Sequence, residues 1–234
     1  MRSHASRGRR KLIVRAAPYG GARDDKRHRR GRLAGRPGHN KGRRYPAEIL
    51  SASEARALVR ASSPRSPTGL RNRALVVVLY RGGLRLAEAL ALAPADVDAA
   101  AGSIRVLHGK GDRARTVGID PAAAGLVAAW AARRRSLGIG PRGPLFCTLD
   151  GGPLQQQYVR TMLGRLRARA GITKRVHPDG LRHTHAAELA AEGWPANLIQ
   201  TQLGHASLAT TDRYLRHIAP RALLEAARRR EWAA

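Results

Sequence analysis

Two arginines stand where a guanidinium could bind an anion beside the start of a helix. Arg85 follows a double glycine and opens an apolar stretch, and Arg182 lies near the start of a second apolar stretch. Free N–H groups and the helix dipole favour an anion there, and a guanidinium can clamp a phosphate with two hydrogen bonds. Glu88, three residues after Arg85, is placed to fix the Arg85 side chain. In isolation this pair would be better explained as a surface ion pair.

A lysine between two glycines, Lys110, occupies a turn sequence that predicts the tip of a β-hairpin. Such a lysine could reach into a groove, or it could belong to an exposed, solvated turn. The Gly-Lys pair is not a phosphate-binding P-loop, because Ile104 stands where the first glycine is needed and Gly111 follows the lysine.

Histidines gather between residues 177 and 185, which raises the question of zinc. His183 and His185 are two residues apart, so they face different sides of a helix, and no cysteine lies near them. We therefore predict no metal site. His205 and Tyr214 follow further along the chain, and each in isolation would be an ordinary packed or surface residue.

The charge of the chain points to a polyanionic partner. The 234 residues hold 44 Lys and Arg against 16 Asp and Glu, a formal net charge of +28. This excludes a protein built to bind cations and favours nucleic acid, or less readily an anionic membrane surface. Aromatic residues at 4% argue against a sheet that reads single strands by stacking, whereas 43% hydrophobic residues suffice for a core.

Half of the net charge lies in residues 1–46, which carry 16 basic and 2 acidic residues. This segment has no periodic apolar pattern, so we predict an arm that is disordered when free. Two interpretations stay open: an arm that follows a phosphate backbone, or a non-native upstream extension.

Residues 47–234 have a globular pattern, which predicts a mainly α fold with a small antiparallel β-sheet. We expect helices over Ser51–Ser62, Thr68–Gly82, Leu86–Leu92, Asp120–Ser136, Leu154–Ala170, Gly180–Gly193, Pro195–Gly204, Ser207–His217 and Pro220–Trp232, and strands over Ser103–His108, Ala114–Ile119 and around Cys147.

Cys147 is the single cysteine, which excludes a disulfide framework and any cysteine-based zinc site. No uncharged run approaches the roughly 18 residues of a membrane span, and no secretory signal is visible, although the Arg-rich start could imitate a transit peptide. We expect a cytoplasmic protein of bacterial type, associated with the nucleoid and not with a membrane.

The order of the motifs carries more information than any motif alone. Arg85, Lys110, Arg182, His205 in Leu-Gly-His, and Tyr214 nine residues later together resemble the catalytic domain of the tyrosine recombinase (phage integrase) family, from about Ala47 to Pro220. The resemblance implies the DNA breaking-rejoining fold and a site-specific recombinase or integrase. It also implies a catalytic domain over residues 47–234.

The resemblance also implies the chemistry. The Tyr214 hydroxyl would attack a phosphodiester and form a 3′-phosphotyrosyl intermediate that keeps the bond energy, so that neither metal, ATP nor any other cofactor is needed. Arg85 and Arg182 would clamp the phosphate oxygens. Lys110 would protonate the departing 5′-oxygen, and His205 would donate a hydrogen bond to the phosphate.

One position departs from the family pattern. Three residues before Arg182 the family usually has histidine, and here it is Asp179. An aspartate repels a phosphate, although it could accept the tyrosine proton or stay protonated, and His177 could partly substitute. Catalytic impairment is therefore an alternative, which makes the chain a DNA-binding protein on the recombinase fold.

The family also implies the partners: double-stranded DNA, a tetramer on synapsed DNA and accessory DNA-bending proteins. Many relatives carry a helical clamp domain before the catalytic one, where this chain has only its basic segment 1–46. Either this arm substitutes for the clamp domain, or the chain is a truncated relative, which would weaken DNA binding and favour the impaired alternative. The helix over residues 220–232 could dock on a neighbouring subunit or pack on its own domain. A type IB topoisomerase shares the chemistry, but the sequence offers no linker or capping domain for it.

Overall fold

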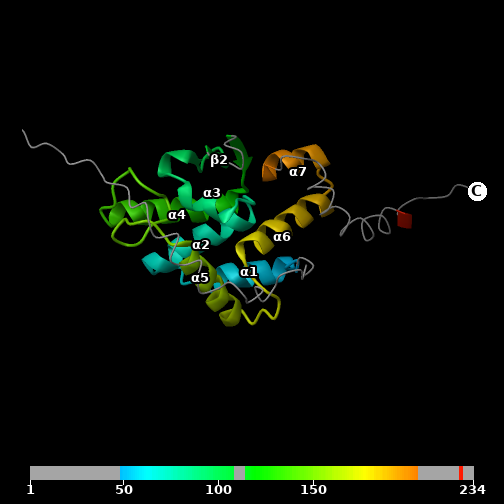
Figure 1. Cartoon of the computed structure of the whole chain (residues 1–234), viewed down its shortest axis with the longest axis horizontal. Helices are drawn as coiled ribbons and strands as arrows, with labels where there is room; N and C mark the ends of the chain where they lie inside the picture. Colours follow the sequence, from blue (N-terminus) through cyan, green and yellow to red (C-terminus); the bar gives the residue numbers. More distant parts are fainter. Residues whose placement is uncertain (1–47, 108–113, 205–226, 229–234) are drawn as a thin grey trace, which may run out of the picture. The chain divides into compact units, whose positions relative to one another are not determined.

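The computed structural model describes residues 48–107, 114–204 and 227–228. A long helix, α2 (Pro67–Tyr80), lies between α1 (Ala52–Arg60) and α4 (Pro121–Ser136) (Figure 1). The helix starts where the Ser66 hydroxyl accepts a hydrogen bond from the Gly69 amide, followed by a proline whose missing N–H costs nothing in the first turn. Every residue from position 74 to 80 is buried, so α2 has no solvent face in its second half and forms the centre of the core.

The helices α1 and α4, which pack against α2, begin at side-chain caps that the sequence makes recognisable. Ser51 and Glu54 form a reciprocal capping box at the start of α1, and Asp120 accepts from the Ala123 amide at the start of α4. The remaining described helices are α3 (Leu86–Ala91), η1 (a 3₁₀ turn, Pro94–Asp96), α5 (Gln156–Arg169), α6 (Pro178–Ala191) and α7 (Ala196–Leu203). Of the described helices, none is both long and apolar enough to cross a lipid bilayer.

The sheet has three antiparallel strands in the order β1 (Val97–Asp98), β2 (Ser103–Val106), β3 (Arg115–Gly118). Ile104 pairs with Val117 at its centre, and both side chains are fully buried. Along β3 the side chains alternate between the inside and the solvent, as a strand with one covered face requires. β3 is an edge strand of this sheet, and α7 packs against it.

Two apolar clusters hold the described residues together. The main one contains α2 and buried side chains from α1, α3, α4, α5 and the sheet. A second, smaller cluster joins α6 to α7 through Ala186, Leu189, Ile199 and Leu203. The apolar contacts of α7 are therefore mainly with α6.

The predicted fold class is confirmed: the described residues are mostly helical, with a small antiparallel sheet. The expected helices from Ser51 to Gly204 are present, with boundaries that differ by at most two residues. The predicted α6 starts too late at Gly180, because the His177 side chain caps the helix and allows it to begin at Pro178. The expected helices over residues 207–217 and 220–232 lie outside the described residues, apart from 227–228, which are helical.

The strand predicted around Cys147 is wrong. Cys147 forms only one isolated β-bridge, with Pro153. The backbone here is satisfied from other directions: Trp130 donates its indole N–H to the Leu145 carbonyl, and Arg71 donates to the Cys147 carbonyl. Buried apolar side chains made this loop look like a strand, but side chains and the backbone of other loop residues, not a neighbouring strand, complete its hydrogen bonds; the Leu145 amide, for example, donates to the Leu92 carbonyl. Conversely, the two-residue strand β1 and the turn η1 were not predicted, because such short elements carry no periodic signal.

Candidate active site

Arg85 is positioned by the double-glycine turn that joins α2 to α3. Gly83 adopts φ +61°, and a Cβ atom there would lie 2.7 Å from the His185 ring and 2.8 Å from Leu203, so only glycine fits. Arg85 is the residue just before α3, and Glu88 binds it twice: Oε2 accepts from the Arg85 amide and Oε1 from Nη1, both at 2.9 Å. The predicted Arg85–Glu88 pair is present, and it is built into the helix start.

Glu88 also binds a second arginine. Its side chain is 4% exposed and accepts hydrogen bonds from Nη1 and Nη2 of Arg115 on β3, at 3.1 and 2.8 Å. Burial alone would raise the pKa of Glu88, but the bonds from Arg115 and from the Arg85 amide lower it to about 2. Glu88 is therefore a carboxylate at neutral pH, and it ties α3 to the sheet.

Arg182 lies in the second turn of α6 and is 4% exposed. Its Nη1 donates to the carbonyl of Gly83, and its Nη2 donates to the carbonyl of Leu203. Arg85 donates through Nη2 to the next carbonyl, that of Gly204, at 3.4 Å. The guanidiniums of Arg85 and Arg182 thus bind consecutive carbonyls at the carboxyl end of α7.

Asp179 is exposed in the first turn of α6, where the helix dipole favours an acid. It lines a cavity of about 480 Å³ together with Arg85 and His177, and Arg160 and Arg175 line the same cavity. His177 is half-buried, and its Nδ1 accepts from the Gly180 amide at 3.1 Å. Burial, followed by the charge of Arg175, lowers the pKa of His177, so the ring is neutral at pH 7. Asp179, which stands where the family usually has histidine, therefore lines the same cavity as Arg85.

The remaining residues singled out in the sequence, Lys110, His205 and Tyr214, lie outside the described residues. Their neighbours along the chain are described. β3 begins five residues after Lys110, and Gly204, which ends α7 in the left-handed conformation, directly precedes His205.

Sequence reasoning missed the role of Arg115 and Gln202. Arg115 and Val117 occupy alternate positions of β3 on its inner face. An arginine on the covered face of a strand indicates that a buried carboxylate partner is present, so this pattern could have identified Arg115. Nothing in the sequence marks Gln202, whose partners on β3 are 84 residues away.

Two further histidines near the site are kept uncharged. Burial lowers the pKa of His183, and it lowers the pKa of His185 further, to about 3. His185 is 3% exposed and packs against Gly83 beneath the Arg85 turn, and neither of its ring nitrogens has a hydrogen-bond partner. Among the described residues, no group of three or more His, Cys, Asp or Glu side chains is arranged to hold a metal ion.

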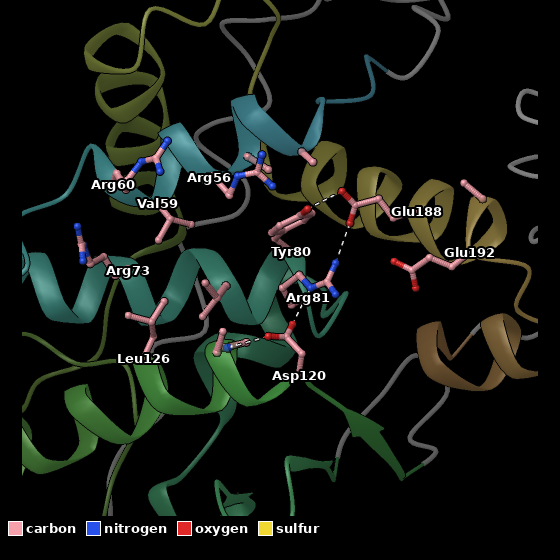
Figure 2. Close-up of a pocket in the computed structure, with 16 residues that line it drawn as sticks. Arg56, Val59, Arg60, Arg73, Tyr80, Arg81, Asp120, Leu126, Glu188 and Glu192 are labelled. Carbon is pink, nitrogen blue, oxygen red and sulfur yellow. Dashed lines mark hydrogen bonds and ion pairs between the residues drawn. The ribbon is translucent and has the colours of Figure 1, made fainter.

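A second cavity is lined by neither Arg85 nor Arg182. It is a groove of about 750 Å³ between α1, α2, α4 and α6, with Arg56, Arg60 and Arg73 along part of its lining. Figure 2 shows Arg81 between two acids: Nε donates to Asp120 at 2.7 Å, and Nη1 donates to Glu188 at 2.9 Å.

Tyr80 completes this network. Its hydroxyl donates to Glu188 at 2.5 Å, and burial followed by this bond raises the pKa of Tyr80 (Figure 2). Asp120 is the residue that caps α4, so the network joins the ends of α2 and α4 to α6. One side of the groove is therefore lined by charged side chains that bind one another and hold each other in place.

The comparisons with known proteins agree on one family. The model of the phage integrase family matches residues 48–220. The tyrosine recombinase XerC of Rhodospirillum centenum is 42% identical over 168 residues, and that of Xylella fastidiosa is 39% identical over 166 residues. These matches cover 70% and 71% of this chain but 49% and 55% of the two relatives, so the chain spans about half of their length.

Solved structures give the same result. The XerA recombinase superposes with a TM-score of 0.70 at 31% identity, covering 81% of this chain and 68% of that one. The XerH site-specific recombinase, in a post-cleavage complex with its palindromic difH substrate, superposes with a TM-score of 0.64 at 29% identity, covering 77% of this chain and 52% of that one. The family model alone covers well over half of the 234 residues. On this evidence the chain belongs to the phage integrase family.

Proposed function

We propose that this protein is a site-specific recombinase that cleaves and rejoins strands of duplex DNA through a 3′-phosphotyrosyl intermediate. The observation that supports it most strongly is the arrangement of Arg85 and Arg182, which bind consecutive carbonyls at one helix end. A guanidinium has five N–H donors, and the bonds from Arg85 to Glu88 and Gly204 use two of them. The Arg85 side chain is 28% exposed, so it can still donate to a phosphate.

In the proposed reaction the Tyr214 hydroxyl gives its proton to a base, for which Asp179 and His177 are the candidates, and its oxygen forms a bond to phosphorus while the bond from phosphorus to the 5′-oxygen breaks. Lys110 gives a proton to the departing 5′-oxygen, and the 5′-hydroxyl of a partner strand later reverses the step. Arg85 and Arg182, with a hydrogen bond from His205, stabilise the negative charge that builds up on the phosphate. Glu88 keeps the Arg85 guanidinium in place because it is a buried carboxylate at neutral pH.

Duplex DNA is the substrate that the charge and the relatives favour. The net charge of +28 suits a phosphate backbone, and the XerH relative was solved on its DNA substrate. In the same proposal, residues 1–46 act as a basic arm ahead of a catalytic domain over residues 47–234, and the protein works on the nucleoid in a bacterial cytoplasm.

Assembly is part of the proposal. Strand exchange between two duplexes needs several active sites, which the family provides as a tetramer, with accessory DNA-bending proteins at some sites. We assign the groove of Figure 2 to the segment Pro220–Ala234 of a neighbouring copy. That segment carries Leu223, Leu224 and Trp232, and the groove offers apolar side chains that include Val59, Val77 and Leu126.

A second candidate is a DNA-binding protein on the same fold that has lost cleavage. Asp179 lines the cavity that Arg85 also lines, and a carboxylate about 4 Å from a phosphate costs about 4 kcal/mol at intermediate dielectric. This candidate predicts DNA binding without covalent chemistry.

The two candidates are separated by a covalent-adduct assay. The full chain is incubated with a pool of nicked duplexes that have a randomised centre, and SDS-resistant protein–DNA adducts are counted for the wild type and for Tyr214→Phe. A recombinase gives adducts that disappear in Tyr214→Phe while DNA binding persists. Binding without adducts in the wild type favours the second candidate and refutes the first.

A further inference from the structure

One side chain on α7 takes the place of a neighbouring strand at the open edge of the sheet. The Gln202 amide donates through Nε2 to the Gly118 carbonyl at 2.7 Å, and its Oε1 accepts from the Gly118 amide at 3.0 Å. Gly118 lies at the end of β3, the edge strand. A primary amide has a donor and an acceptor side by side, so it can satisfy both backbone groups of one strand residue at once.

The same short stretch of α7 is bound from three other directions. Leu203 and Gly204 offer their carbonyls to Arg182 and Arg85. The guanidinium of Arg115 packs against Gly204 so closely that a Cβ atom there would lie 2.7 Å from its Nε. Gln202 is therefore next to the two residues whose carbonyls orient both arginines of the candidate active site.

Apolar packing does not fix this arrangement by itself. The buried cluster that holds α7 is made with α6, through Leu189, Ile199 and their neighbours, and is separate from the main core. Apolar contacts are non-directional, so the position of α7 along β3 depends on directional bonds. The Gln202 amide makes the two shorter hydrogen bonds between these elements, at 2.7 and 3.0 Å, whereas Arg115 Nε donates to the Gln202 carbonyl at 3.5 Å.

We propose that Gln202 is a positioning residue for the arginine pair: its amide fastens α7 to β3, so that the carbonyls of Leu203 and Gly204 orient the guanidiniums of Arg182 and Arg85. This inference rests on the proposed recombinase function. It adds a requirement for a residue that touches neither the DNA nor the reacting atoms.

The test compares cleavage with binding in three variants of the full chain. Gln202→Leu keeps the volume of the side chain and removes both hydrogen bonds, and Gln202→Glu keeps the acceptor and loses the donor. Asn197→Asp makes the same amide-to-acid change at an exposed position of the same helix and serves as the control. Adduct formation is measured on the nicked duplexes that the wild type selects, DNA affinity by gel shift, and melting temperature by calorimetry.

Gln202→Leu is expected to cleave about tenfold more slowly, equivalent to about 1.4 kcal/mol of transition-state stabilisation, with DNA affinity and melting close to the wild type. Gln202→Glu should regain activity relative to the wild type as the pH falls toward its carboxyl pKa, because a protonated acid again has one donor and one acceptor. Asn197→Asp should behave as the wild type throughout.

Equal cleavage by Gln202→Leu and the wild type overturns the inference and leaves the proposed function intact. A loss of DNA affinity as large as the loss of cleavage also overturns it, because the glutamine would then serve binding or folding in general. A wild type that forms no adduct overturns the proposed function and this inference with it.

Discussion

Arg115 on β3 and Glu88 on α3 form a two-bonded ion pair, 27 residues apart in the chain, beneath the helix start that carries Arg85. Replacing Glu88 with glutamine removes the charge that both arginines face. Because breaking a buried ion pair leaves an uncompensated charge, we expect Glu88→Gln to lower the free energy of unfolding by about 3 kcal/mol. Urea unfolding measures this, and Glu192→Gln, an exposed acid at the end of α6, is the matched control. A loss as small as that of the control contradicts the assigned role of Glu88.

The buried ring of His185 makes stability depend on pH. Burial lowers the pKa of this imidazole from 6.5 to about 3, so between these values the unfolded chain binds a proton that the folded chain does not. Stability is therefore lost as the pH falls through this window, by up to about 1.4 kcal/mol per pH unit from this group. His185→Phe should have a shallower slope of stability against pH in urea unfolding between pH 6 and pH 4, which lies inside this window.

The control for this slope is Ile199→Val, which trims a buried side chain in the cluster between α6 and α7 without changing any titrating group. It should lower stability at every pH and keep the slope of the wild type. His177 and His183 also have lowered pKa values, so the slope of His185→Phe is expected to shrink and not to vanish. An unchanged slope in His185→Phe would show that the ring charges within the fold.

Asp179 is expected to limit cleavage. Asp179→His removes a negative charge from the cavity that Arg85 lines and restores the residue type of the family pattern. We expect a higher yield of covalent adduct on nicked DNA, by about thirtyfold if half of the electrostatic cost, about 2 kcal/mol, is relieved. Asp150→His, at an exposed position elsewhere, controls for the change in net charge. Equal yields from the wild type and Asp179→His would show that Asp179 does not limit cleavage.

The groove of Figure 2 is expected to serve assembly. Ala122→Trp and Ala191→Trp start from exposed positions and place an indole in the groove. Each should abolish slowly migrating multimeric complexes on DNA in a native gel while preserving the complex of one protein with one duplex. Ala132→Trp, exposed on the same helix as Ala122 but outside the groove, should change nothing. Multimers that survive both groove substitutions would exclude this docking site.

Much of the fold could be predicted because local signals agree with it. Ser51, Ser66 and Asp120 mark helix starts through their side-chain oxygens, and the double glycine marks the turn before Arg85. The Cys147 segment was mistaken for a strand because burial alone does not reveal what satisfies a backbone. There the partners include the side chains of Trp130 and Arg71, 15 and 76 residues away in the chain, which no strand pattern reveals.

The site could be predicted only in part, for the same reason. Arg85 and Glu88 are recognisable because they lie three residues apart at a helix start, and Arg182 is recognisable from its place in the order of the family motifs. The link from Gln202 to Gly118 and the link from Arg115 to Glu88 join residues 84 and 27 positions apart, and they follow from the packing of α7 and α3 on β3. A single sequence carries no record of such pairs.

The most direct test of the central claim locates the covalent bond. Nicked duplexes are labelled at either the 5′ or the 3′ end of the cleaved strand, incubated with the full chain and separated in SDS. A 3′-phosphotyrosyl link predicts that the 5′-end label migrates with the protein, that the 3′-end label leaves on a fragment with a free 5′-hydroxyl, and that peptide mapping places the nucleotide on Tyr214. Labels that both remain free, or an adduct that persists in Tyr214→Phe, would contradict the account.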